Sequence, residues 1–265
     1  MPYPSTPKQE PDADVFLPEL DDPQSRHLMA KIARMFLHIG TMVEVERFRE
    51  TFCLPLEARE LSRRALLLYD YYLEAAVGKL QRKGWRMYCS PGCAACCYAM
   101  PAGISSWELI LIYDHLQQSG QLERFFRRNL ECCQVLSRVK REVAARMPSG
   151  QTEAPEDYDN RVLYSYSLAR KPCAFLSKSR ECLIYSLRPL ACRMHFSFTP
   201  GEWCDPADPR FRQAVRLNFR PHSEVQEHLR RLETRLGLEV SDLLAPGLVT
   251  LTANIMRFSA ISWMS

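Results

Sequence analysis

Cys89-Ser-Pro-Gly-Cys93-Ala-Ala-Cys96-Cys97 is the stretch that interrupts an otherwise helical sequence pattern and sets the organisation of the chain. Pro91 and Gly92 supply the tight turn that such a loop needs. Cys93 and Cys96 have the two-residue spacing at which two thiolates turn onto one metal ion. A second group follows, with eight, nine and eleven residues between its members: Cys173, Cys182, Cys192 and Cys204. The two groups predict two irregular loops that meet in space.

Apolar residues at helical spacing flank the first cysteine group on both sides. Before it, they predict helices over about 25–49 and 55–83, with Pro55 in the first turn of the second helix and Gly84 at its end. After it, Ser105-Ser-Trp-Glu108 is a capping box, which predicts a helix running to about 118. Further helices are predicted over 122–146, 223–236 and 246–261, with a loop over 147–161 and hairpin-like strands near 161–166 and 182–185.

The predicted fold class is therefore mainly α, an irregular helical domain in which two cysteine-bearing loops meet at a metal site, with a short β-hairpin. Residues 1–23 contain six prolines among acidic and small polar residues, a composition that predicts a flexible tail. Residues 24–265 are predicted to form one mainly helical domain that contains the cysteine-cluster region, 88–205.

Composition and charge exclude some functions. Hydrophobic residues make up 46% of the 265 residues and charged residues 25%, values of an ordinary globular protein. The net charge of +4 gives no case for a nucleic-acid binder. No apolar run approaches the ~18 residues of a membrane span, and the polar N-terminus has no signal-peptide core. The expected compartment is the cytoplasm, where thiols stay reduced.

Eleven cysteines in one chain require an explanation. Cys53, Cys132 and Cys133 are interpreted as small buried hydrophobes. For the eight clustered cysteines, packing, thiol–disulfide chemistry and metal ligation are the alternatives, and ligation is favoured. Cys96 and Cys97 are adjacent, and on an extended backbone their side chains would point to opposite sides. Eight thiolates with one adjacent pair thus indicate either two four-thiolate sites or a polynuclear cluster.

Two arginines accompany the second group, in Arg188-Pro-Leu-Ala-Cys192-Arg193. A four-thiolate zinc site carries a net charge of −2, so a nearby guanidinium would offset that charge and donate N–H to sulfur. His195 lies three residues beyond Cys192 and is a candidate ligand or donor to a ligand.

These residues resemble the YkgJ-type cysteine-cluster family, also described by its CxxCxxCC pattern. The resemblance covers about 88–205 and includes the string Tyr185-x2-Arg188-Pro-x2-Cys192-Arg193. It implies a zinc- or iron-chelating domain, with iron–sulfur as one form of the iron. The implied metal ligands are Cys89, Cys93, Cys96, Cys97, Cys173, Cys182, Cys192 and Cys204. Around the ligands, Tyr185, Arg188, Arg193 and His195 are predicted to form the next layer of the site.

Three functions remain open at this stage. The first is a metal-binding protein with a structural or metal-handling role, whose partners are the metal ion and, in one version, a protein. The second is an iron–sulfur enzyme similar to the flagellin lysine N-methylases, and the third is a thiol oxidoreductase. The sequence has no Gly-rich phosphate loop, no His-Glu-x2-His and no Gly-x-Ser-x-Gly, so no catalytic residues are assigned.

Overall fold

The structure, a computed structural model, describes residues 21–146 and 154–264. Most of the predicted tail, 1–23, lies outside the described residues. The mainly α prediction is confirmed. The helices are α1 (Pro23–Thr41), α2 (Val43–Glu46), α3 (Phe48–Thr51), α4 (Leu56–Arg82), α5 (Ser106–Gln118), α6 (Leu122–Ala145), α7 (Pro155–Leu168), α8 (Leu190–Arg193), α9 (Ser223–Leu236) and α10 (Leu244–Thr250). The strands are β1 (Cys53–Pro55), β2 (His195–Ser197), β3 (Arg216–Asn218) and β4 (Ser262–Met264).

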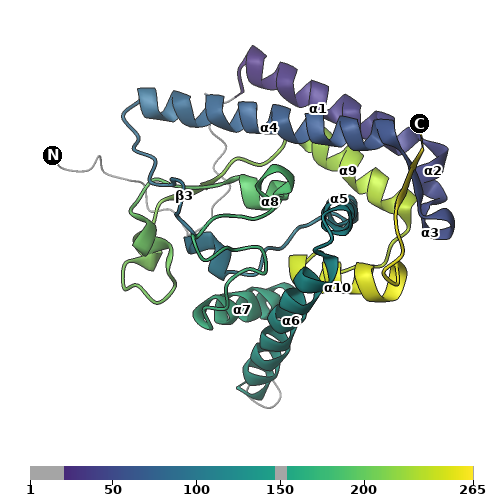
Figure 1. Ribbon diagram of the computed structural model, residues 1–265. Coiled ribbons are helices and arrows are strands. Elements are labelled where there is room, and N and C mark those ends of the chain that lie inside the picture. Colours follow the sequence, from purple (N-terminus) through teal and green to yellow (C-terminus); the bar gives the residue numbers. More distant parts are fainter. Residues whose placement is uncertain (1–20, 147–153, 265) are drawn as a thin grey trace.

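A helical frame surrounds α5. Every residue from Ser106 to Asp114 is buried, so this helix is covered on all sides rather than along one stripe. Trp107 has no exposed surface, and its indole Nε1 donates to Ser62 Oγ of α4 at 2.8 Å. Helices α1 and α4 lie side by side along one edge of the frame, and α9 packs against α1 (Figure 1).

The C-terminal segment closes the frame at its other end. Helix α10 passes so close to α5 that a Cβ on Gly247 would lie 2.7 Å from Leu109 Cδ1 and 2.3 Å from the carbonyl oxygen of Ser241. Glycine is therefore required there for close packing. Beyond α10, β4 pairs in parallel with β1, and the buried carboxylate of Asp114 accepts the Trp263 indole N–H at 2.8 Å.

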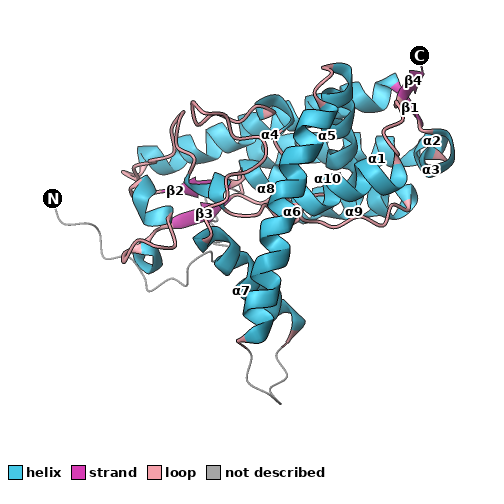
Figure 2. Cartoon of the chain, turned by 60° about the horizontal axis from the view of Figure 1, so that its bottom comes forward, coloured by secondary structure: helices cyan, strands magenta, loops and turns pink. Residues whose placement is uncertain are grey.

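The cysteine region occupies the end of the molecule opposite β1 and β4. Figure 2 shows it as loops gathered around the antiparallel pair β2–β3. Four short 3₁₀ helices lie in this region: η2 (Ala95–Tyr98), η3 (Tyr185–Leu187), η4 (Gly201–Cys204) and η5 (Phe211–Gln213). Helices α6 and α7 pack against each other and project together from the body (Figures 1 and 2).

Several predicted elements are wrong in their bounds or type. The first helix ends at Thr41 rather than near 49, because Met42 takes an extended backbone and the chain restarts in α2 and α3. Residues 155–161 begin α7 instead of completing a loop, since Pro155 at the first position and two acids in the first turn favour a helix start. The strands predicted near 161–166 are likewise part of α7.

Two further predictions, the strand near 182–185 and the helix over 246–261, also differ from the structure. Cys182 makes an isolated bridge with Leu176, and the antiparallel pair is formed instead by β2 and β3, which lie far apart in the sequence. The last helix ends at Thr250, where a π-helical turn, η6 (Leu251–Ile255), leads into β4.

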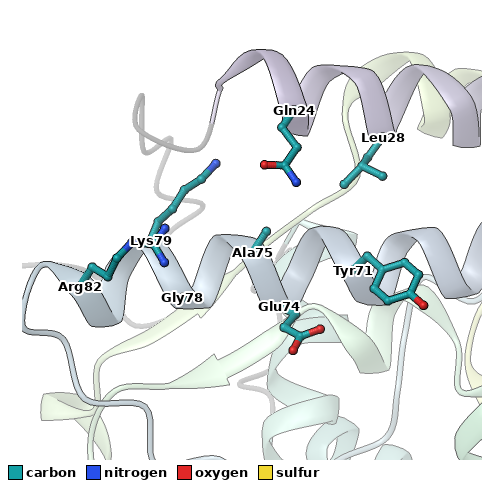
Figure 3. Close-up of a pocket in the computed structure, with 8 residues that line it drawn as sticks. All are labelled: Gln24, Leu28, Tyr71, Glu74, Ala75, Gly78, Lys79 and Arg82. Carbon is teal, nitrogen blue, oxygen red and sulfur yellow. The ribbon is translucent and has the colours of Figure 1, made fainter.

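A shallow groove of about 510 Å³ lies between α1 and α4. Figure 3 shows the small residues Ala75 and Gly78 at its floor, with Lys79 and Arg82 at one end. All of its lining residues come from these two helices, so the groove is separate from the cysteines. Within the described part of the chain, every helix is too short or too polar to traverse a lipid bilayer.

The start of α1 predicts a measurable pH dependence. Asp22 caps α1, accepting from the backbone N–H of Gln24 at 2.8 Å, and its carboxylate pairs with Lys79 of α4. The hydrogen bond from Lys79 is the main cause of the lowered pKa of Asp22. A lowered folded-state pKa gives stability that is present above the unfolded pKa, near 3.9, and lost as the pH falls through the folded pKa.

We therefore expect Asp22→Asn to reduce the free energy of unfolding by about 1 kcal/mol at pH 7, because asparagine still caps a helix but carries no charge. The difference from the unsubstituted protein should shrink as the pH falls below 4. Urea unfolding at pH 7 and pH 3 measures it. Asp21→Asn is the matched control, because Asp21 pairs with Arg26 at an exposed position. Its effect should be under about 0.5 kcal/mol.

Candidate metal centre

The first cysteine loop is held against β2 by its backbone and by sulfur. Tyr88 N donates to the Ser197 carbonyl at 2.9 Å, and Ser197 N donates to Cys89 Sγ at 3.1 Å. The chain then turns at Gly92, whose φ of +84° lies in the left-handed region that favours glycine, and Cys93 N closes the turn on the Ser90 carbonyl. The turn predicted from Pro91 and Gly92 is confirmed, and it brings Cys89 and Cys93 together.

Cys89 and Cys93 share a thiol hydrogen bond. This bond is the main cause of a raised pKa at Cys89 and a lowered pKa at Cys93. Gly201, at the start of η4, lies against Cys93. A Cβ added to Gly201 would be 3.5 Å from Cys93 Sγ. The first loop therefore contacts the segment that carries Cys204.

Cys96 and Cys97 lie on η2 rather than on an extended strand. The expectation that their side chains point to opposite sides is wrong, because a 3₁₀ helix turns by only about 120° per residue. The two thiols are hydrogen-bonded to each other, which is the largest cause of the raised pKa of Cys96. The adjacent cysteines therefore present a pair of neighbouring sulfurs.

The second group approaches the same place. Cys173 N donates to the Cys97 carbonyl at 2.7 Å, which joins the two cysteine segments directly. Cys182 is turned back beside Cys173 by its bridge with Leu176. Cys192 lies on α8, and burial raises its pKa to about 12 and also raises that of Cys173. The electrostatic neighbours of Cys192 include the thiols of Cys96 and Cys182.

Two buried charged residues fix α8 on the frame. Glu108 completes the predicted capping box with Ser105, and its second oxygen accepts from Leu190 N at 2.7 Å. Arg193 is only 2% exposed and donates to Asp70 of α4. It also donates to the carbonyls of Arg188 at 2.5 Å, Ser186 at 2.8 Å and Tyr185 at 3.2 Å. These bonds orient the backbone next to Cys192.

The other residues predicted around the ligands differ in their surroundings. Arg188 lies among the thiols, where its charge favours the thiolate forms of Cys96, Cys182 and Cys192. Tyr185 is 64% exposed and stacks under the Arg188 guanidinium, 5.3 Å from the ring centre. His195 is exposed and pairs with Asn218 across β2 and β3. Arg193 donates the hydrogen bonds described above to carboxylate and carbonyl oxygens rather than to sulfur.

Sequence reasoning missed several residues beside the thiols. Arg180 acts electrostatically on Cys93, and Arg216 acts on Cys204. Ser197 touches Cys89 through its N–H and Cys204 through its side chain. None of the three belongs to a spacing pattern. For Arg180, its position within three residues of Cys182 was the one sequence signal that could have placed it near the thiols.

The three cysteines outside the two groups vary in burial. Cys132 is buried as expected, whereas Cys53 and Cys133 are only partly buried. Cys132 Sγ donates to the Pro172 carbonyl at 3.7 Å, so it supports the residue before Cys173.

The donor set fits a soft metal ion in its chemistry. The eight clustered cysteines are all free thiols, and thiolate is the ligand that zinc and iron–sulfur centres prefer. Two N–H donors beside them, Arg188 Nε and Trp203 Nε1, are buried and have no hydrogen-bond partner among the described residues. Donors of this kind hydrogen-bond to metal-bound sulfur. Across residues 21–146 and 154–264, no three Cys, His, Asp or Glu side chains are close enough as placed to hold a metal ion.

The fold and these gathered thiols define a helical protein that carries a cysteine-rich domain at one end. Residues 88–209, a little under half of the chain, match the CxxCxxCC family, described as a "Putative zinc- or iron-chelating domain". This match confirms the resemblance found in the sequence and supports metal binding without deciding between zinc and iron. No curated protein and no solved structure matches the chain.

Proposed function

We propose that residues 88–209 form a metal-binding domain whose thiolates hold zinc or iron and thereby fasten two loops to the helical frame. The observation that carries this proposal is the direct contact between the two cysteine segments, Cys173 N to the Cys97 carbonyl at 2.7 Å. Residues far apart in the sequence are thereby brought to one place, as a structural metal site with all ligands from protein requires.

The net charge of the segment that carries the second cysteine group favours thiolates over neutral thiols. Residues 169–222 contain ten Lys and Arg against four Asp and Glu, a net charge of +6, whereas the whole chain carries +4. A divalent ion with four thiolates is anionic, so an excess of cations nearby lowers its electrostatic cost. Without a metal, burial and mutual repulsion raise the pKa of most of these thiols, so binding displaces their protons.

A non-catalytic role is favoured over the two enzyme readings. An iron–sulfur methylase needs a place for its methyl donor, and the described groove between α1 and α4 has no cysteine in its lining. A thiol oxidoreductase needs a solvent-facing thiolate next to its partner thiol. Cys96 is the exposed thiol beside its neighbour Cys97, but its pKa is raised, first of all by the hydrogen bond with Cys97, so the neutral thiol is favoured there.

Metal content of the purified protein tests the proposal. We expect protein prepared without oxygen to contain zinc or iron, and Cys93→Ser and Cys192→Ser to lose metal and unfold the 88–209 region at lower temperature. Elemental analysis and circular dichroism measure the two effects. A brown protein with acid-labile sulfide would identify an iron–sulfur centre, and a colourless one with zinc would identify a structural zinc site.

Cys133→Ser is the matched control, because Cys133 lies on α6 outside both groups and should leave the metal content unchanged. Equal metal in all three variants, or a metal-free protein that cycles with a dithiol, would remove the assignment.

A further inference from the structure

Helix α4 carries a stripe of residues on its solvent side. The members of this α4 stripe recur every three or four residues, which places them on one face of the helix. They are Glu60, Arg64, Leu67, Tyr71, Glu74, Gly78 and Arg82, and all but Gly78 are exposed. At the middle of the stripe, Leu67 is 51% exposed and Tyr71 is 53% exposed. Two large side chains one turn apart thus form an apolar centre on an otherwise charged face.

The surface is hollowed on both sides of this apolar centre. Beyond Tyr71 lies the groove of about 510 Å³ between α1 and α4, with Gly78 at its floor and Arg82 at its end (Figure 3). A Cβ added to Gly78 would lie 3.6 Å from Arg82 Nη1, the end of a flexible side chain, so the floor can accommodate an incoming side chain. Before Leu67 lies a second hollow of about 410 Å³, formed by the first half of α4.

The charges on this face of α4 change sign about the apolar centre. Acids come first, then bases, then the apolar pair, then an acid and finally bases, in the order Glu57, Glu60, Arg63, Arg64, Leu67, Tyr71, Glu74, Lys79 and Arg82. The order is antisymmetric, because charges at similar distances before and after the midpoint are of opposite sign. An exposed charged face needs no partner, but this particular order makes the face complementary to an antiparallel copy of itself.

We infer that the α4 stripe binds a second copy of the chain, with the two α4 helices antiparallel across a two-fold axis midway between Leu67 and Tyr71. In this arrangement Leu67 of each copy faces Tyr71 of the other, and Arg64 faces Glu74. Every such pairing occurs twice, because the same surface is used by both copies. Among the ion pairs that α4 makes with described residues, none involves Arg64 or Glu74.

The same register fills the groove between α1 and α4. Glu60 of the second copy lies over Gly78, where the groove has room, and between the bases Lys79 and Arg82 at its end. Glu60 is otherwise paired only with exposed Arg63 of its own helix, at 3.7 Å, an interaction of little strength. The stripe contains no cysteine, so this inference goes beyond the metal-binding domain and does not depend on it.

The mass of the full-length protein in solution tests the inference. A contact made by one helix from each copy is small for a specific interface, so we expect a dimer to form at about 10 to 100 µM. Sedimentation equilibrium over this range measures it. Arg64→Glu and Glu74→Arg each place like charges opposite each other at two positions, and each should weaken association by about tenfold or more. Arg141→Glu, at an exposed position on α6, is the matched control and should leave association unchanged.

A mixture of the two charge-reversed variants is the decisive experiment. Mixed one to one, the Arg64→Glu and Glu74→Arg proteins should associate as the unsubstituted protein does, because the acids of one chain then face the bases of the other. The two positions lie about 15 Å apart on one helix, so this rescue cannot arise within a single copy. The double variant Arg64→Glu/Glu74→Arg should also dimerise.

Three results would overturn the inference: an unsubstituted protein that stays monomeric across this range, a dimer that neither charge reversal weakens, or a mixture that associates no more than its components. Circular dichroism shows whether each variant is folded. Metal content should be equal in all of them, so failure of this inference leaves the proposed function standing.

Discussion

Arg193→Ala is expected to lower the free energy of unfolding by about 3 kcal/mol, because the substitution removes a buried guanidinium and leaves its partners unpaired. Arg193 is 2% exposed and donates to Asp70 and to three backbone carbonyls. Asp70 is 44% exposed and regains water when its partner is lost, so we place the effect at the lower end of the range for broken buried pairs. The three carbonyls also lose the donor that the buried guanidinium supplies, which adds to the cost.

Urea unfolding followed by circular dichroism measures this loss. Arg193→Lys should recover less than half of it, since an ammonium cannot reproduce the planar fork of a guanidinium. Arg212→Ala is the matched control, because Arg212 is exposed and the substitution should change stability by no more than about 0.5 kcal/mol. Equal stability of the Arg193→Ala and Arg212→Ala proteins would show that the hydrogen bonds of Arg193 between α4 and α8 contribute nothing to the free energy of unfolding.

The second large effect is expected at Glu108. One carboxylate oxygen of Glu108 accepts from Ser105 N and Oγ at 2.9 and 2.7 Å, and the other accepts from Leu190 N at 2.7 Å. Glu108→Ala removes all three bonds in a buried place, and bonds to a charged acceptor contribute about 1.5–3 kcal/mol each. We expect the free energy of unfolding to fall by about 3 kcal/mol, and the amide of Leu190 to exchange its hydrogen faster.

Glu108→Gln separates the two roles of this side chain. Its single carbonyl oxygen can serve either Ser105 or Leu190 but not both, so about half of the stability should return. Glu123→Ala is the matched control, because Glu123 also lies in the first turn of a helix but pairs only with exposed Arg127. It should cost about 0.5 kcal/mol or less. Unchanged exchange at Leu190 in Glu108→Ala would contradict the anchoring role.

Local sequence patterns predicted those elements whose signals are themselves local. The capping box at Ser105–Glu108 predicted the start of α5, and apolar periodicity predicted α4, α6 and α9 to within one or two residues at each end. The prediction failed at α7, because the acidic residues after Pro155 had been assigned to a loop although acids in a first turn favour a helix. It also failed at β2 and β3, whose pairing joins segments with no local signal.

The sequence by itself determined that eight cysteines form two groups and that a helical frame flanks them, since spacing and periodicity are properties of neighbouring residues. Only the tertiary structure decided which thiols are neighbours, because Ser197 and Gly201 contact Cys89 and Cys93 across long separations in the chain. It also assigned Arg193 to Asp70 instead of to sulfur. A buried guanidinium is stable only where several acceptors converge, and the folded chain provides those acceptors around α8.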